Sequence, residues 1–135
     1  MNINKILENV DGSYSGDNLD IKSIAYDSRK ILSDSLFVAI KGLEFDGHDY
    51  ILDAVDKGAL AIIASKPEVS DIPIPVIQVK DTRKALSKLA ANFYDQPSKK
   101  INTIGVTGTN GKTTTCYIIN SILNSNGLTS GSIGT

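Results

Sequence analysis

The sequence INTIGVTGTNGKTTT at residues 101–115 has the order of a strand, a glycine loop and a helix. Ile104 and Val106 belong to an apolar β-branched run that ends at Gly108, and a helical pattern begins near Lys112. This is the layout of a phosphate-binding loop, in which glycines let backbone N–H groups turn inward and the helix N-terminus adds unpaired donors. The stretch therefore predicts a nucleotide site.

The residue types within this loop suit a bound triphosphate. Lys112 is placed to reach the β- and γ-phosphates, and the hydroxyl of Thr113 is placed to contact Mg²⁺. The general loop pattern has a glycine five residues before Gly111, where this sequence has Val106. The alternative is a turn that merely joins a strand to a helix, and it is disfavoured because a lysine buried at a helix start is otherwise costly.

Composition excludes several classes of protein. The chain has 135 residues, of which 41% are hydrophobic and 21% charged, which suits one ordinary domain or one small domain and part of another. A net charge of −1 gives no reason to expect a nucleic-acid or membrane partner, and a single cysteine excludes an internal disulfide framework. No apolar run approaches the length of a membrane span and no signal-peptide core is present, so we expect a cytoplasmic protein. We also expect it to be a monomer.

Residues 1–98 alternate between apolar strands and helical patterns, which predicts an α/β fold. The expected strands are residues 21–26, 36–40, 59–64 and 76–79. Their unbroken apolar runs indicate a sheet that is covered on both faces. The expected helices are residues 3–9, a helix from Tyr50 that ends at Gly58, and a long amphipathic helix capped by Asp81.

The sequence after Pro97 predicts a second, incomplete domain. Residues 97–100 have the composition of a linker, so we place a domain at 1–98 and the start of another at 99–135. The latter holds one strand, the glycine loop, a helix ending at Gly127 and a last strand near residues 129–133. Two strands and one helix cannot bury both faces of a parallel sheet, so we expect the chain to be the N-terminal part of something longer.

Two sets of motifs resemble one known family. The string VTGTNGKTTT at residues 106–115 resembles the ATP loop of the Mur ligases, which build the peptide of bacterial cell-wall precursors; folylpolyglutamate and cyanophycin synthetases share it. DSR at 27–29, LFVAIKG at 36–42 and DGH at 46–48 resemble the uridine-nucleotide domain of the MurE and MurF ligases. FYDQPS at 93–98 is similar to the MurE branch in particular.

The resemblance implies an ATP-dependent ligase of peptidoglycan biosynthesis. Such an enzyme adds an amino acid, L-lysine or meso-diaminopimelate, to UDP-N-acetylmuramoyl-L-Ala-D-Glu through an acyl phosphate. A MurF-type ligase that adds D-Ala-D-Ala and a non-catalytic module that binds a UDP-sugar peptide both stay open. The family's further Mg²⁺ ligands and its amino-acid-selecting domain would lie beyond residue 135, so we expect the chain alone to be inactive.

The resemblance also implies site residues by position. The ATP-binding residues would be Gly108, Thr109, Asn110, Gly111, Lys112, Thr113 and Thr114, with Lys112 catalytic and Thr113 the Mg²⁺ contact. The residues that contact the UDP-N-acetylmuramoyl dipeptide would be Tyr26, Ser28, Leu43, Glu44 and Phe45.

The remaining candidates in the first domain have structural alternatives. Ser28 binds the uracil or simply ends a strand in a turn. Phe45 stacks on the base or anchors the core. Arg29 is expected to form a local ion pair with Asp27. His48 is the one histidine, and a structural role at a helix start is favoured over that of a general base.

Overall fold

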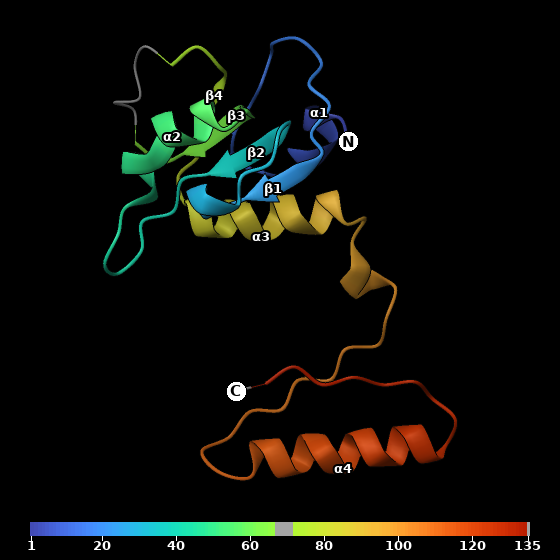
Figure 1. Ribbon diagram of the computed structural model, residues 1–135. Coiled ribbons are helices and arrows are strands. Elements are labelled where there is room, and N and C mark those ends of the chain that lie inside the picture. The colour runs from blue at the N-terminus through green and yellow to red at the C-terminus, as the bar shows by residue number, and fades with distance from the viewer. Residues whose placement is uncertain (67–71, 135) are drawn as a thin grey trace. The chain divides into compact units, whose positions relative to one another are not determined.

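The computed structural model describes residues 1–66 and 72–134 and divides into two units, residues 1–100 and 101–135 (Figure 1). The boundary predicted at residue 98 lies close to this division. Among the residues described, no helix is both long and apolar enough to cross a bilayer.

The first unit is built on a four-stranded parallel sheet with the strand order β1-β2-β3-β4. Its strands are β1 (Ser23–Ala25), β2 (Ser35–Val38), β3 (Ala59–Ala64) and β4 (Val76–Gln78). The register places Ile24 beside Leu36 and Ile63 beside Ile77. The four predicted strands are confirmed, although all except β3 are shorter than the apolar runs that predicted them.

Helices cover both faces of this sheet (Figure 1). The helices are α1 (Ile3–Ile6), α2 (Ile51–Asp56) and α3 (Thr82–Phe93), with 3₁₀ turns at Ser28–Lys30, Gly47–Tyr50 and Pro97–Lys99. One buried cluster joins α1 and α3 to the sheet, and a second joins α2 to the opposite face. The α/β fold predicted from the sequence is confirmed.

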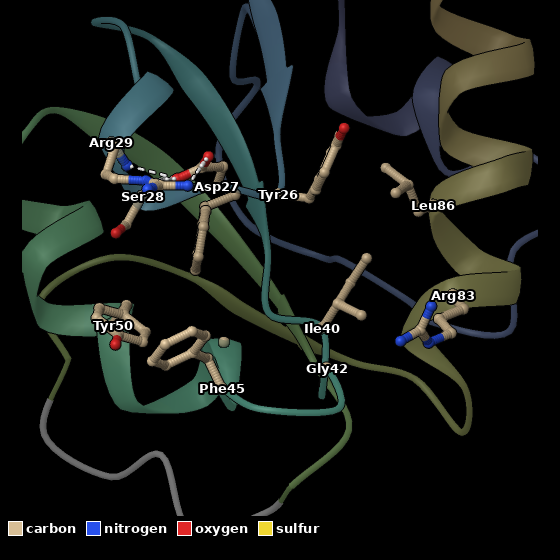
Figure 2. A pocket seen from close by; sticks show the side chains of 12 residues that line it. Tyr26, Asp27, Ser28, Arg29, Ile40, Gly42, Phe45, Tyr50, Arg83 and Leu86 are labelled. Atoms are coloured by element: carbon tan, nitrogen blue, oxygen red, sulfur yellow. Dashed lines mark hydrogen bonds and ion pairs between the residues drawn. The ribbon is translucent and has the colours of Figure 1, made fainter.

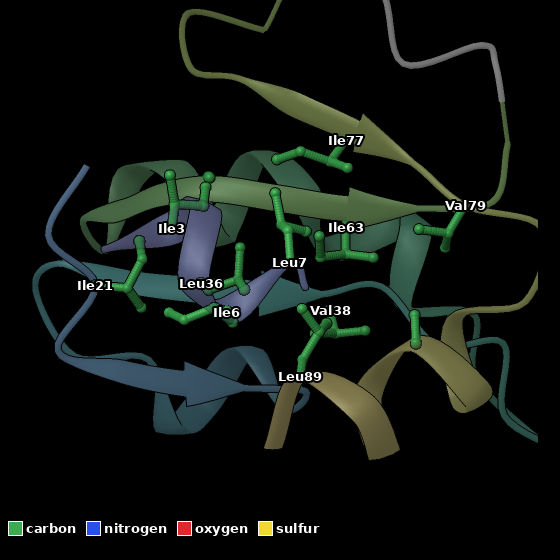
Figure 3. Close-up of a cluster of buried hydrophobic side chains, with 12 residues drawn as sticks. Ile3, Ile6, Leu7, Ile21, Leu36, Val38, Ile63, Ile77, Val79 and Leu89 are labelled. Atoms are coloured by element: carbon green, nitrogen blue, oxygen red, sulfur yellow. The ribbon is translucent and has the colours of Figure 1, made fainter. Parts of the chain in front are cut away.

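Successive residues of the central strands point to opposite faces of the sheet. Leu36 and Ile63 belong to the cluster under α1 and α3, which Figure 3 shows. Phe37 and Ile62, their chain neighbours, belong to the cluster under α2. Because both faces of the central strands are buried, apolar residues are favoured at successive positions, which explains the runs at residues 36–38 and 59–64.

The predicted helix ends of the first unit are also confirmed. The Asp81 carboxylate accepts hydrogen bonds from the backbone N–H groups of Arg83 and Lys84, both at 3.0 Å, and so caps α3. Helix α2 ends before Gly58, whose φ of +93° is a left-handed conformation that glycine adopts most readily.

The second unit contains α4 (Lys112–Ser125), and Gly127 follows its end with a φ of +77°. The two strands predicted around it, residues 101–106 and 129–133, do not form. A strand is defined by its hydrogen-bonded neighbours, and among the described residues no backbone hydrogen bond joins either segment to a strand. The apolar β-branched pattern was therefore insufficient to produce a strand here.

Candidate functional site

A cavity of about 690 Å³ lies beyond the carboxyl ends of β1 and β2 (Figure 2). In open parallel sheets this edge is where ligands bind, because helix N-termini and connecting loops converge there. The residues that line the cavity are Tyr26, Asp27, Ser28, Arg29, Phe37, Ile40, Gly42, Phe45, Gly47, Tyr50, Arg83 and Leu86.

The structure brings together some of the residues predicted to contact the substrate. Tyr26, Ser28 and Phe45 line the cavity, whereas Leu43 and Glu44 do not. Leu43 is fully exposed and Glu44 is also exposed, at the tip of the turn that precedes Phe45. These two residues therefore lie next to the cavity without forming its wall.

Sequence reasoning missed the contribution of α3 to this cavity. Arg83 and Leu86, one helical turn apart, line it from the first half of α3. The signal that could have found them is the cap at Asp81. A helix that begins directly after a parallel strand starts at the carboxyl edge of the sheet, so its first turn faces any ligand bound there. Tyr50, from the turn before α2, was missed in the same way.

A narrow turn at residues 41–47 places Phe45 beside the cavity. The Gly42 N–H donates to the Phe45 carbonyl, and the Gly47 N–H donates to the Ile40 carbonyl, both at 2.8 Å. A Cβ at Gly47 would lie 2.6 Å from the Ile40 nitrogen, so only glycine allows this close approach. Phe45 itself is 68% exposed, so the alternative that it anchors the core is wrong.

Ser28 begins the 3₁₀ turn after β1 and is nearly buried. Its carbonyl accepts a hydrogen bond from the Lys57 Nζ at 3.0 Å. Hydrogen bonds from Lys57 and from the Ser28 side chain lower the pKa of Asp53. Because an ionised carboxylate only accepts hydrogen bonds, the Ser28 hydroxyl is the donor in its hydrogen bond with Asp53. The Ser28 hydroxyl oxygen can then accept a hydrogen bond from a ligand, for example from the N3–H group of a uracil base.

Asp27 and Arg29 form the local ion pair predicted from the sequence. The Arg29 Nε donates to one carboxylate oxygen at 2.9 Å and an Arg29 terminal nitrogen donates to the other at 2.8 Å (Figure 2). The Arg29 side chain, helped by its backbone N–H, lowers the pKa of Asp27 to about 2. The carboxylate is therefore ionised near neutral pH, and the two charges compensate each other at the cavity wall.

His48 has the structural role that was favoured from the sequence. Its Nδ1 lies 2.6 Å from an Asp46 carboxylate oxygen, and its Nε2 accepts the backbone N–H of Ser65 at 3.1 Å. Asp46 is also paired with Lys66 at 2.7 Å, and Lys66 and His48 together hold the pKa of that carboxyl well below its usual range. These contacts tie the turn at residues 41–47 to the end of β3.

The loop predicted to bind phosphates, in the second unit, is shaped by its glycines and its lysine. Gly111 precedes α4 with a φ of +72°, a left-handed conformation in which a side chain would be strained. The Lys112 Nζ folds back over the loop and donates to the Gly108 carbonyl at 2.7 Å. Lys112 is the only charged residue in the sequence from 101 to 135, so this unit carries one uncompensated positive charge.

The other predicted ATP-binding residues surround Lys112 and are exposed. Thr109 and Asn110 form the bend before Gly111, and Thr113 and Thr114 lie in the first turn of α4. Thr115 is already engaged, because its hydroxyl donates to the Gly111 carbonyl at 2.9 Å. Within the described residues the Thr113 hydroxyl has no hydrogen-bond partner. Exposed donors, a cation and a helix N-terminus without acidic neighbours fit a polyphosphate and its Mg²⁺.

Comparison with known proteins gives a family match for the first unit. The family model described as "Mur ligase family, catalytic domain" matches residues 20–94, a range that includes every residue lining the cavity. The UDP-N-acetylmuramoyl-L-alanyl-D-glutamate--2,6-diaminopimelate ligases of Oceanobacillus iheyensis and Clostridioides difficile are 47% and 48% identical to the whole chain. The chain spans 28% of the length of each of these relatives.

Solved structures of similar proteins include D-alanyl-D-alanyl ligases and MurF proteins. The UDP-N-acetylmuramoylalanyl-D-glutamyl-2,6-diaminopimelate--D-alanyl-D-alanyl ligase of Acinetobacter baumannii matches with a TM-score of 0.66 and 32% identity over 90% of this chain and 27% of its own. MurF of Thermotoga maritima, solved in complex with ADP, matches with a TM-score of 0.58 and 34% identity over 77% of this chain and 23% of its own.

Proposed function

Because this chain belongs to the Mur ligase family, we propose that the protein carrying it is an ATP-dependent ligase of cytoplasmic peptidoglycan synthesis. It joins 2,6-diaminopimelate to UDP-N-acetylmuramoyl-L-alanyl-D-glutamate. The observation that carries this proposal is the identity of 47% and 48%, over the whole chain, to two relatives named for that reaction. L-lysine is the other amino acid that the sequence motifs leave open.

The first unit would bind the uridine nucleotide. The cavity at the ends of β1 and β2 offers exposed aromatic rings at Tyr26 and Phe45 and a hydroxyl at Ser28. Aromatic rings stack on a base, and the hydroxyl oxygen accepts a hydrogen bond from it. Leu43 and Glu44, at the tip of the neighbouring turn, would close over the nucleotide rather than form the floor of its site.

The second unit would bind ATP through Gly108–Thr114. Lys112 and the exposed amides at the start of α4 supply positive charge for the β- and γ-phosphates, and Thr113 offers its hydroxyl to Mg²⁺. When bound, Mg²⁺ neutralises the charge that develops on the phosphates. The similar MurF structure solved in complex with ADP shows that one relative binds an adenine nucleotide, which supports ATP as the ligand proposed here.

These two sites suit the formation of an amide from a carboxylate and an amine. A carboxylate is a poor electrophile, so it would first take the γ-phosphoryl group of ATP and release ADP. The amine would then attack the resulting acyl phosphate, forming the amide and releasing phosphate. Lys112 would stabilise the charge on the phosphoryl group during its transfer. Its present bond to the Gly108 carbonyl holds the ammonium group over the loop, where the phosphates would replace the carbonyl as its partner.

A MurF-type ligase is the second candidate, because the solved relatives include MurF proteins. Identity favours the first candidate: the diaminopimelate ligases share 47% and 48% with this chain, against 32% and 34% for the MurF structures.

A single assay separates these candidates. The purified protein that carries this chain is incubated with ATP, Mg²⁺ and either the UDP-muramoyl dipeptide or the UDP-muramoyl tripeptide, with diaminopimelate, L-lysine or D-Ala-D-Ala as the amine. Mass spectrometry then identifies the product. We expect diaminopimelate to be joined to the dipeptide. Addition of D-Ala-D-Ala to the tripeptide would favour the MurF-type reaction, and nucleotide binding without any product would indicate a non-catalytic module.

A further inference from the structure

Arg83 supplies the uncompensated charge of the cavity in the first unit. Three of the lining residues are charged: Asp27, Arg29 and Arg83. Asp27 and Arg29 are bonded to each other through both carboxylate oxygens, at 2.9 and 2.8 Å, so they contribute little net charge. The cavity therefore has an excess positive charge at Arg83.

The guanidinium of Arg83 also has unused hydrogen-bond donors. Within the described residues it donates one hydrogen bond, from a terminal nitrogen to the Lys41 carbonyl at 3.1 Å, whereas a guanidinium has five N–H donors. Among residues 1–66 and 72–134, no carboxylate lies within ion-pair distance of it. Asp81, the acid nearest in sequence, accepts the backbone N–H groups of Arg83 and Lys84 and so serves as the helix cap.

The position of Arg83 is fixed from two sides. Its backbone belongs to the first turn of α3, and its side chain is bonded to the residue that precedes Gly42 in the turn beside the cavity. Figure 2 shows Arg83 and Leu86 on the α3 side of the cavity, across from Phe45 and Tyr50. The cavity thus has the rings of Phe45 and Tyr50 at one side and the uncompensated charge of Arg83 at the other.

This polarity matches a nucleotide with its base at one end and its phosphates at the other. We propose that Arg83 binds the diphosphate of the uridine nucleotide, while the base lies on the side of Phe45 and Tyr50. A guanidinium suits this role because its planar donors bond two phosphate oxygens at once. The inference rests on the proposed function, since it takes the ligand of this cavity to be a uridine nucleotide.

The test compares UDP with uridine, which lacks phosphate. Calorimetry measures the affinity of the 135-residue chain for each ligand, in the wild type and in Arg83→Gln, Arg83→Lys and Lys84→Gln. Lys84 is the matched control, because it is the next residue of the same turn, carries the same charge and does not line the cavity. Thermal unfolding of each variant establishes that it is folded.

We expect Arg83→Gln to lose about ten- to a hundredfold in affinity for UDP, the scale of a hydrogen bond to a charged group. Its affinity for uridine should be unchanged, Arg83→Lys should retain part of the affinity for UDP, and Lys84→Gln should resemble the wild type. Equal losses for UDP and uridine in Arg83→Gln would overturn the proposal, since they would show that Arg83 acts by holding the turn at Lys41.

Two other results would also overturn it. If Arg83→Gln binds UDP as the wild type does, Arg83 makes no phosphate contact and the dipeptide carboxylates become its candidate partner, while the proposed function stands. If the wild-type chain binds neither UDP nor uridine, the uridine-nucleotide assignment of the cavity fails, and the role of Arg83 fails with it.

Discussion

At the scale of single residues, Lys112 is distinguished by a positive charge that has no acidic neighbour in its unit. Lys112 is the only charged side chain from residue 101 to residue 135, and its ammonium group is bonded to a loop carbonyl rather than to a carboxylate. An anion can therefore replace that carbonyl without breaking an ion pair. The contrast with Arg29, which is already paired with Asp27, indicates which cations of this chain are available to a ligand.

Replacing Lys112 with methionine tests this role. Lys112→Met should lower kcat of the ligase reaction by about a hundred- to a thousandfold, the scale of a lost charge-stabilising donor, because the phosphoryl group would no longer face a cation. The measurement is the rate of phosphate release that depends on the amine, in the protein that carries this chain. Lys99→Met, which removes an exposed cation from the turn before the second unit, is the control. Equal rates for both variants would contradict the assigned role.

The ion pair between Asp27 and Arg29 predicts a dependence of stability on pH. Arg29 lowers the pKa of Asp27 to about 2 in the folded protein, against about 3.9 for an unfolded chain. A lowered pKa means that the contribution to stability is present above the unfolded value and is lost as pH falls through the folded value. The free energy of unfolding should therefore decrease as the pH is lowered from about 4 to about 2.

Urea unfolding over this pH range checks the prediction in matched variants. Asp27→Asn should show a weaker decrease than the wild type, since its side chain no longer takes up a proton. Asp56→Asn removes an exposed carboxylate for which the described residues provide no ion-pair partner, and should keep the wild-type dependence. If Asp27→Asn and the wild type lose stability in parallel, the pair does not stabilise the folded state.

At the scale of elements, the apolar patterns predicted the first unit well. Each strand of the sheet and both helix ends, at Asp81 and Gly58, could be placed from sequence because burial on two faces and backbone caps leave local signals. The strands expected at residues 101–106 and 129–133 did not form. A β-branched run expresses a preference, but a strand also requires a hydrogen-bonded neighbour, which a local pattern does not reveal.

The candidate site, like the fold, could be predicted from the sequence only in part. Ser28 and Phe45 were placed from motifs, because the turns that hold them have characteristic residues. Arg83 and Tyr50 were not, because the starts of their helical segments mark the carboxyl edge of the sheet but do not reveal which side chains line a cavity there. Their contribution depends on how β1, β2 and α3 meet at one edge of the sheet.

The cap of α3 gives a prediction at this scale. Asp81→Ala should lower the free energy of unfolding by about 1 kcal/mol, because two backbone N–H groups lose their acceptor. Asp81→Asn keeps an oxygen that accepts from these groups and should cost less. Urea unfolding at neutral pH measures both. Equal stability of Asp81→Ala and the wild type would show that solvent replaces the cap at no cost.

At the scale of the whole molecule, the two units differ in how they are stabilised. The first unit has two buried clusters on a covered sheet, whereas α4 has no buried residue and exposes Tyr117, Ile118 and Ile122. The chemistry assigned to them differs as well: one offers an aromatic and cationic cavity, the other a glycine loop with a single lysine. We propose that the first unit binds the uridine nucleotide and the second binds ATP.

Nuclear magnetic resonance of the ¹⁵N-labelled chain tests that assignment most directly. During titration with UDP, we expect the amide chemical shifts of Ser28, Gly42 and Gly47 to change at UDP concentrations that leave the shifts of residues 108–114 unchanged. Movement confined to residues 108–114, or signals beside the cavity that stay fixed at saturating UDP, would contradict it.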